Sequence, residues 1–139
     1  MAKQTGLGWT TLDIDDSGGT AQDLRGNTTN FSFATPRAVQ DVTGIDKSAM
    51  ERLLLLADFS ISLSGVFDDA SADSCHDVFK DIGAGTGAYN SRTTTIAVSG
   101  QSLANEVLYT DYALTRAADG SLTFSVPGVL ADGTVPTWS

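Results

Sequence analysis

Two residue types that often do chemistry, one cysteine and one histidine, are adjacent in this chain as Cys75 and His76. A thiolate beside an imidazole is a common nucleophile and base pair. The flanking residues instead predict a helix, because an apolar stripe at i, i+3, i+4 and i+7 runs from Cys75 through Val78 and Phe79 to Ile82. Neighbours on a helix point about 100° apart and do not face each other. We therefore predict structural roles for both residues. One cysteine and one histidine also exclude a cysteine–histidine zinc site within one chain.

Other short patterns that could bind a ligand are incomplete. The segment DIDDSG (13–18) matches the start of a calcium-binding loop, but Leu24 stands where the bidentate glutamate belongs. The segment GAGTG (83–87) follows the predicted helix instead of a strand, and it lacks the lysine of a phosphate-binding loop. The nucleophile motif GxSxG is absent. We therefore predict no metal, no cofactor and no enzymatic activity.

Composition limits the classes of protein that remain. The chain has 139 residues, a normal size for one domain, and we treat residues 1–139 as one domain. Its net charge is −9, with 17 acidic against 8 basic side chains, so its overall field repels nucleic acid. No apolar run is long enough to span a membrane, and the first residues lack the features of a signal peptide. A single cysteine forms no internal disulfide, so we expect folding in a reducing cytoplasm.

Hydrophobic periodicity predicts a mainly β fold with one helix. Alternation of apolar and polar residues is typical of a strand with one buried face. The segments that show it are 8–16, the stretch around Phe31 and Phe33, 59–67 and 92–100. The helix is expected over residues 70–82, with Ser71 as its N-cap and Gly83 as its C-cap.

Residues 106–117 and 121–126 predict a β-hairpin with two alternative registers. A two-residue loop pairs Phe124 with Thr115. A three-residue loop, with a glycine in the left-handed region, pairs Phe124 with Leu114. We favour the second register because it matches two large apolar residues across the strands.

Two segments have no regular period. Residues 34–57 are expected to form a long loop, in which the leucine run 53–56 fits neither the helix nor the strand period. Such a run is buried either under the domain's own sheet or against a neighbouring molecule, and the sequence leaves both open. Residues 127–139, with two prolines and two glycines, are expected to form an extended arm. The candidate subunit-contact residues are Leu53, Leu54, Leu55, Leu56, Pro127, Val129, Leu130, Val135 and Trp138.

Three stretches together carry a resemblance to a known family: FATPRAVQDVTGIDKSAMERLLLLADFSISLSGVFDD, SADSCHDVFKDI and LTRAADGSLTFSVPGVLADGTVPTW. In this order they resemble the major tail protein, or tail tube protein, of long non-contractile-tailed (siphovirus-like) bacteriophages, most of all phages of actinobacteria. The resemblance runs from about residue 10 to the end of the chain. It rests on the order of the elements and on likeness along each stretch, not on a short catalytic signature.

The resemblance implies a β-sandwich or barrel of two packed antiparallel sheets with one flanking α-helix. It also implies homohexameric rings whose inner sheets join into a barrel, and rings that stack into a hollow tube for DNA ejection. A long loop and the chain termini would reach adjacent rings. The implied partners are further copies of the chain, a tape-measure protein, a tail terminator and a distal tail protein. Genomic DNA would pass through the lumen without specific binding. The implied location is the virion tail, after assembly in the host cytoplasm, with no membrane involved.

Two alternatives to a tube subunit remain from the sequence. A tail terminator or an injection-system tube protein would share the fold, and a terminator would stop at a single ring. A carbohydrate-binding β-sandwich would need exposed aromatic rings, and the candidates are Trp9, Tyr89, Tyr109 and Trp138. The acidity of the chain favours a conduit, because a basic lumen would retain DNA and an acidic one would let it slide.

Overall fold

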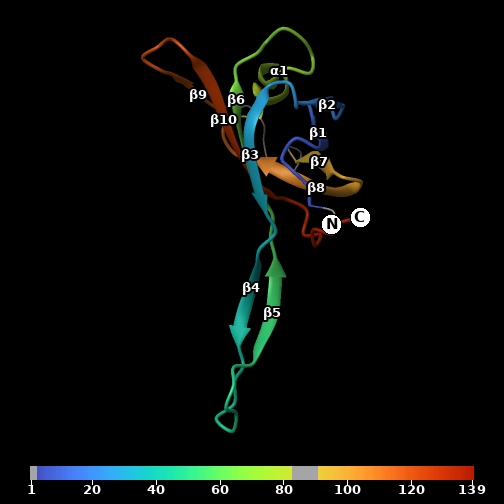
Figure 1. The fold of residues 1–139 in the computed structure, drawn as a ribbon, viewed down its shortest axis with the longest axis vertical. Helices are drawn as coiled ribbons and strands as arrows, with labels where there is room; N and C mark the ends of the chain where they lie inside the picture. The colour runs from blue at the N-terminus through green and yellow to red at the C-terminus, as the bar shows by residue number, and fades with distance from the viewer. Residues whose placement is uncertain (1–2, 83–90) are drawn as a thin grey trace.

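The computed structural model describes residues 3–82 and 91–139, and in these residues it contains ten β-strands and one short helix (Figure 1). The fold is mainly β, as the sequence predicts. The elements are β1 (Trp9–Asp15), β2 (Ala21–Asp23), β3 (Thr28–Ala34), β4 (Arg37–Asp41), β5 (Arg52–Ala57), β6 (Ser60–Val66), α1 (Cys75–Phe79), β7 (Arg92–Val98), β8 (Gln101–Tyr109), β9 (Ala113–Arg116) and β10 (Leu122–Leu130).

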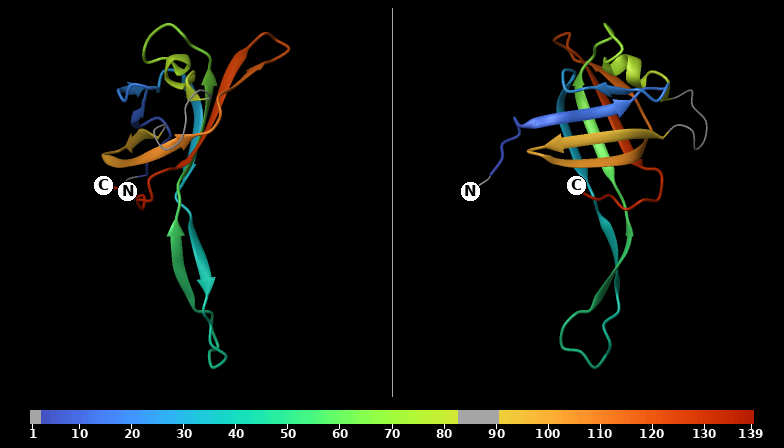
Figure 2. Two further views of the ribbon diagram at one scale, coloured as in Figure 1. Left: turned by 180° about the vertical axis from the view of Figure 1, so that it is seen from behind. Right: turned by 90° about the vertical axis from the view of Figure 1, so that its right-hand side faces the viewer.

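Eight of these strands form one antiparallel sheet that folds over into two layers. Its order is β2-β1-β7-β8-β10-β6-β3, and β9 pairs with β10 beside that path. Strand β10 belongs to both layers, because residues 128–130 pair with β8 while residues 122–125 pair with β9. One layer is therefore β2-β1-β7-β8 and the other is β3-β6-β10-β9. Figure 2 shows the strands of the two layers crossing each other, which confirms the expected sandwich of packed antiparallel sheets.

The hydrophobic core lies between the two layers. Along each central strand every second residue points inward, as the alternation in the sequence predicts. Leu12 and Ile14 of β1 and Ile96 of β7 meet Leu63 of β6 and Phe124 of β10, and all five side chains are fully or almost fully buried. This burial fixes the register of the strands, because a shift by one residue would turn every core side chain toward water.

Helix α1 is shorter than predicted, with five residues instead of the expected 70–82. Its N-cap is Ser74, whose Oγ accepts a hydrogen bond from the Asp77 N–H, and not Ser71. Ser71 instead forms a turn in which its carbonyl oxygen accepts the Ser74 N–H at 3.1 Å. Short polar side chains before the helix favour such turns over helical backbone. Cys75, Val78 and Phe79 of the apolar stripe are nonetheless fully buried, and Ile82 is partly buried against the core. The predicted cap at Gly83 and the segment 83–87 lie outside the described residues.

The β9–β10 hairpin confirms the favoured register. Leu114 is opposite Phe124, and Gly120 has a φ of 94°, the left-handed conformation that a three-residue loop requires. The predicted strand 106–117 is interrupted, however, at residues 110–112. The interruption lets β8 pair within one layer while β9 pairs within the other.

Residues 37–57 form a β-hairpin where the sequence predicts a loop. Strands β4 and β5 pair antiparallel, with Val39 opposite Leu54 and Asp41 opposite Arg52. This projecting hairpin continues the direction of β3 and β6 and extends away from both layers (Figure 1). Neither of its faces meets the core, so its sequence carries no alternation of apolar and polar residues.

We expect the substitution Gly65→Ala to lower the free energy of unfolding by about 2 kcal/mol or more. Gly65 lies on the core side of β6, and an added Cβ there would overlap the carbonyl oxygen of Asn27. The obstacle is backbone, so it cannot rotate away. Urea denaturation followed by circular dichroism measures the change. Gly26→Ala is the matched control, because a Cβ at Gly26 meets nothing within 4 Å. Equal unfolding free energies for the two variants would contradict this prediction.

Candidate assembly surface

The leucine run lies on strand β5 of the projecting hairpin and is exposed. Leu54 and Leu56 are 64% and 85% exposed, and Leu53 and Leu55 are 53% and 39% exposed. Leu53 and Leu54 pair in regular register with Gln40 and Val39, so they point to opposite faces and both faces of the hairpin carry leucine. The register shifts between Leu54 and Ala57, so Leu55 and Leu56 lie at an irregularity of the strand. Burial under the domain's own sheet, one of the two alternatives that the sequence left open, does not occur in this chain. Large apolar side chains that gather on a surface are typical of an interaction site.

The base of the hairpin forms a groove together with the C-terminal segment, residues 131–139. The cavity measures about 370 Å³. Leu55 and Leu56 line one side, and Leu130 and Val135 line the other. The structure therefore brings four of the nine predicted contact residues together at one place. Leu53 and Leu54 lie on the same strand, before the residues that line this groove.

The C-terminal segment lies against the body of the molecule. Ser139 and Ser102 exchange two backbone hydrogen bonds of 2.9 and 3.0 Å, and their hydroxyl groups are 2.9 Å apart. The ring centroid of Trp138 is 5.9 Å from that of Phe33. The extended arm begins at residue 131 and not at residue 127, because Pro127 and the three residues after it belong to β10.

Pro127 and Val129 form a third group of the predicted contact residues. They lie on the exposed face of β10, opposite Ser62 and Ser60 of β6. This face points away from the core and away from the groove. The nine residues are thus distributed over the projecting hairpin, the groove at its base and one sheet face, with Trp138 apart from these three places.

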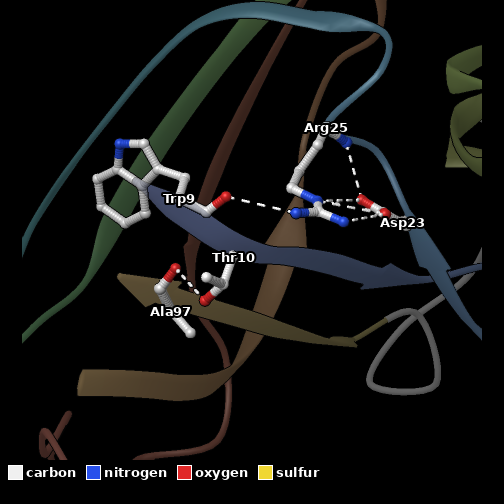
Figure 3. Close-up of polar contacts among 5 residues, drawn as sticks. All are labelled: Trp9, Thr10, Asp23, Arg25 and Ala97. Atoms are coloured by element: carbon white, nitrogen blue, oxygen red, sulfur yellow. Dashed lines mark hydrogen bonds and ion pairs between the residues drawn. The ribbon is translucent and has the colours of Figure 1, made fainter. Parts of the chain in front are cut away.

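An aromatic cluster closes the open side of the sandwich next to a pocket of about 320 Å³. The Trp9 and Phe31 rings meet edge to face, with centroids 4.8 Å apart, and both residues line the pocket. Figure 3 shows how Arg25 is held at this position. Its guanidinium forms an ion pair with Asp23 at 2.9 Å and donates to the Trp9 carbonyl oxygen at 3.4 Å. Nearby, the hydroxyl of Thr10 donates to a carbonyl oxygen of β7 at 3.2 Å.

Among the described residues proposed for sugar stacking, Trp138 alone is exposed, at 44%, so they form no shared exposed platform. Tyr109 is buried, and burial raises the pKa of its hydroxyl, which lies 2.5 Å from the hydroxyl of Thr94. The rings of Trp9 and Trp138 both contact Phe33. Tyr89 lies outside the described residues. The described residues therefore give the carbohydrate-binding alternative no support.

Cys75 and His76 both have surroundings typical of structural residues. Cys75 is fully buried, and this burial raises the pKa of its thiol. His76 packs against the ring of Phe67, and its Nδ1 lies 3.3 Å from the hydroxyl of Tyr112. The arrangement joins α1 to the start of β9 and agrees with the structural roles predicted for both residues.

The acidic segment 13–18 forms a turn that satisfies its own carboxylate. Asp16 Oδ1 accepts hydrogen bonds from the Gly18 N–H at 2.9 Å and the Thr20 N–H at 3.0 Å. These hydrogen bonds hold the pKa of Asp16 below its ordinary value. Within residues 3–82 and 91–139 no three histidine, cysteine, aspartate or glutamate side chains come together in a way that could hold a metal ion. The same described residues contain no helix with the length and apolar character needed to cross a membrane.

Comparison with known proteins identifies the fold. No protein-family model and no curated protein sequence matches this chain. One similar solved structure is described as the tail of an empty gene transfer agent particle, obtained with helical refinement and C6 symmetry. Its TM-score is 0.74 at 17% identity, over 99% of this chain and 98% of that chain. A second is the virion of a native gene transfer agent particle, with a TM-score of 0.71 at 17% identity over 99% of both chains. At this level of identity the comparison establishes a shared fold along almost the whole length.

Proposed function

We propose that this chain is the repeating subunit of a phage-like tail tube, in which rings of six copies stack into a hollow tube that conducts DNA. The observation that carries the proposal is the projecting hairpin, with apolar side chains exposed on both faces, on a fold shared with a helical C6 tail. A monomer gains nothing from such a hairpin, whereas a subunit that is repeated along an axis can bury it in the next copy.

Free strand edges give the ring a means to close. In the layer β3-β6-β10-β9, the outermost strands β3 and β9 pair with no further strand among the residues described. All neighbours in this layer are antiparallel, so the four strands alternate in direction. Strand β9 of one copy would therefore lie antiparallel to β3 of the next copy in a head-to-tail ring. Such closure pairs the free edges of this layer, so these edges are no longer exposed to pair with other chains in uncontrolled aggregation.

The projecting hairpin supplies the contact between rings. Residues 37–46, if extended at about 3.3 Å per residue, reach roughly 30 Å from the base of the hairpin. With this length, we propose that the hairpin crosses onto a copy in the adjacent ring and buries leucines from both of its faces there. The groove formed by Leu55, Leu56, Leu130 and Val135 joins the hairpin to the C-terminal segment, so both would contribute to this contact.

The remaining parts of the proposal follow from the family resemblance. The tube would assemble around a tape-measure protein in the host cytoplasm and become part of the virion tail. A tail terminator and a distal tail protein would bind its two ends. The chain would act as a structural, non-enzymatic protein that lets DNA pass without specific binding.

Electron microscopy and light scattering of the purified protein test the proposed function. We expect tubes with six-fold end views as the protein concentration rises. Single rings that never stack would indicate a tail terminator on the same fold. A protein that stays monomeric at every concentration would contradict the tube.

We expect removal of residues 131–139 to raise the protein concentration needed for assembly at least tenfold. This truncation leaves β10 complete, so the β signal in circular dichroism should persist, whereas removal from residue 127 would take away residues that pair with β6 and β8. Sedimentation of assembled tubes measures the change. Val135→Ser is the milder companion variant, because Val135 is a groove residue that is 51% exposed. Assembly of the truncated protein at the original concentration would contradict a role for this segment.

A further inference from the structure

One face of the layer β3-β6-β10-β9 carries no charged side chain in its four strands, all of which lie within the described residues. This face, which we call the hydroxyl face, is the side that points away from the core. Its centre consists of two rows across the strands, Ser125–Ser64–Asn30 and Pro127–Ser62–Ser32. Its other members are serine, threonine, alanine and valine. A sheet face in water normally includes charged residues, and their absence in a chain of net charge −9 needs an explanation.

Within the two layers, the acidic residues of the strands gather on the opposite side of the molecule. Asp13 and Asp15 of β1 and Glu106 of β8 alternate with core residues, so they point outward from the layer β2-β1-β7-β8. Asp23 of β2 is directly opposite Asp13, and Arg25 compensates this pair of like charges. The negative charge carried by the strands of the two layers is therefore confined to one outer face, and the remaining strand acid, Asp41, lies on the projecting hairpin.

Ring closure decides which outer face meets the bore, the hollow axis of the tube. If the edges of β3 and β9 join between copies, the layer β3-β6-β10-β9 becomes the wall of a cylinder. About 24 strands spaced about 4.8 Å apart close to a cylinder roughly 37 Å or more across. The core side of the wall is already covered by the layer β2-β1-β7-β8 and by α1, so these elements must lie outside it (Figure 2). Only the hydroxyl face is left to line the bore.

We propose that the hydroxyl face lines the bore and that double-stranded DNA slides along strands without fixed charge. This inference rests on the proposed tube. It differs from the acidic lumen that the composition suggested, because the acids on the strands of the two layers face the exterior. A neutral wall neutralises no phosphates and releases no counterions, so it offers DNA no electrostatic binding site. Its small side chains also present no aromatic surface on which bases could stack.

Thiol labelling of two single-cysteine positions tests the assignment. Ser62→Cys places a thiol at the centre of the hydroxyl face, and Ala104→Cys places one on the exposed outer side of β8. Cys75 is fully buried, so the unsubstituted protein gives the background reaction. Each variant is treated, before and after assembly, with a small maleimide and with the same maleimide attached to a polymer too bulky to enter the bore.

In assembled tubes, we expect Cys at position 62 to react with the small reagent and to react at least tenfold more slowly with the bulky one. Cys at position 104 should react with both reagents. Reaction of position 62 with both reagents would show that the hydroxyl face lies on the outside of the tube. Reaction with neither reagent would show that this face is buried in a contact between copies. Either result would overturn the assignment of the bore and leave the proposed tube standing. Ser125→Cys repeats the test on the neighbouring strand if Ser62→Cys does not fold. A failure of the unsubstituted protein to form tubes would instead overturn the proposed function.

Discussion

The double variant Leu54→Asp/Leu56→Asp is expected to form no tubes while keeping the fold of the monomer. Both leucines are largely exposed, so their replacement removes little packing within one chain. In the tube, burial of each leucine would contribute about 1.5–3 kcal/mol, and the variant would also bury unpaired carboxylates. The concentration needed for assembly should therefore rise about 100-fold or more. Light scattering and electron microscopy measure assembly, and circular dichroism with thermal melting checks the fold.

Two companion variants make this result specific. Ala104→Asp adds a carboxylate at an exposed position on the outer side of β8, outside the hairpin, so it should assemble like the unsubstituted protein. Leu53→Asp/Leu55→Asp changes the other two leucines of the same strand and shows whether the whole leucine run is engaged. Normal tubes from the Leu54→Asp/Leu56→Asp protein would show that the hairpin does not make the contact between rings.

The parts of the fold that the sequence predicted well are those with one buried and one exposed face. Strand β6 is an example, because Ile61 and Leu63 alternate with serines, and only one register buries the apolar residues. The hairpin register was predictable for the same reason, since Leu114 and Phe124 are the large residues that a three-residue loop matches. In these places the local pattern and the tertiary structure impose the same constraint.

The projecting hairpin could not be predicted in this way. Its strands are exposed on both faces in the single chain, so no period of two separates core from solvent. The leucine run indicated an unusual surface, but only the strand pairing shows that Leu55 and Leu56 share a groove with Val135. The separation of charge between the two outer faces was equally hidden. Composition gives only the total charge, whereas the assignment of each charged side chain to one face requires the register of its strand.

Tubes that contain Ser62→Lys are expected to retain double-stranded DNA that unsubstituted tubes release. Position 62 lies at the centre of the hydroxyl face, so in a six-fold ring it would add six positive charges around the bore. Retention of a short DNA duplex by pelleted tubes should rise at least tenfold at low salt. It should fall steeply as salt increases, because the logarithm of the binding constant drops by about 0.9 per phosphate neutralised for each tenfold rise in salt.

Nuclease protection separates binding in the bore from binding on the exterior. Ala104→Lys adds the same charge to the outward side of β8, and DNA attracted there should be digested by a nuclease too large to enter the tube. DNA retained by Ser62→Lys tubes should be protected. Ser62→Gln adds a long side chain without charge, and it should retain no more DNA than the unsubstituted tube. If Ser62→Lys retained no DNA, or retained DNA as digestible as that on Ala104→Lys tubes, the hydroxyl face could not be the wall along which DNA moves. If DNA retention instead rises with the positive charge at position 62 and falls with salt, the absence of charge on the wall is what lets DNA pass. The acids on the opposite face would then serve to keep assembled tubes apart in solution and not to repel their cargo.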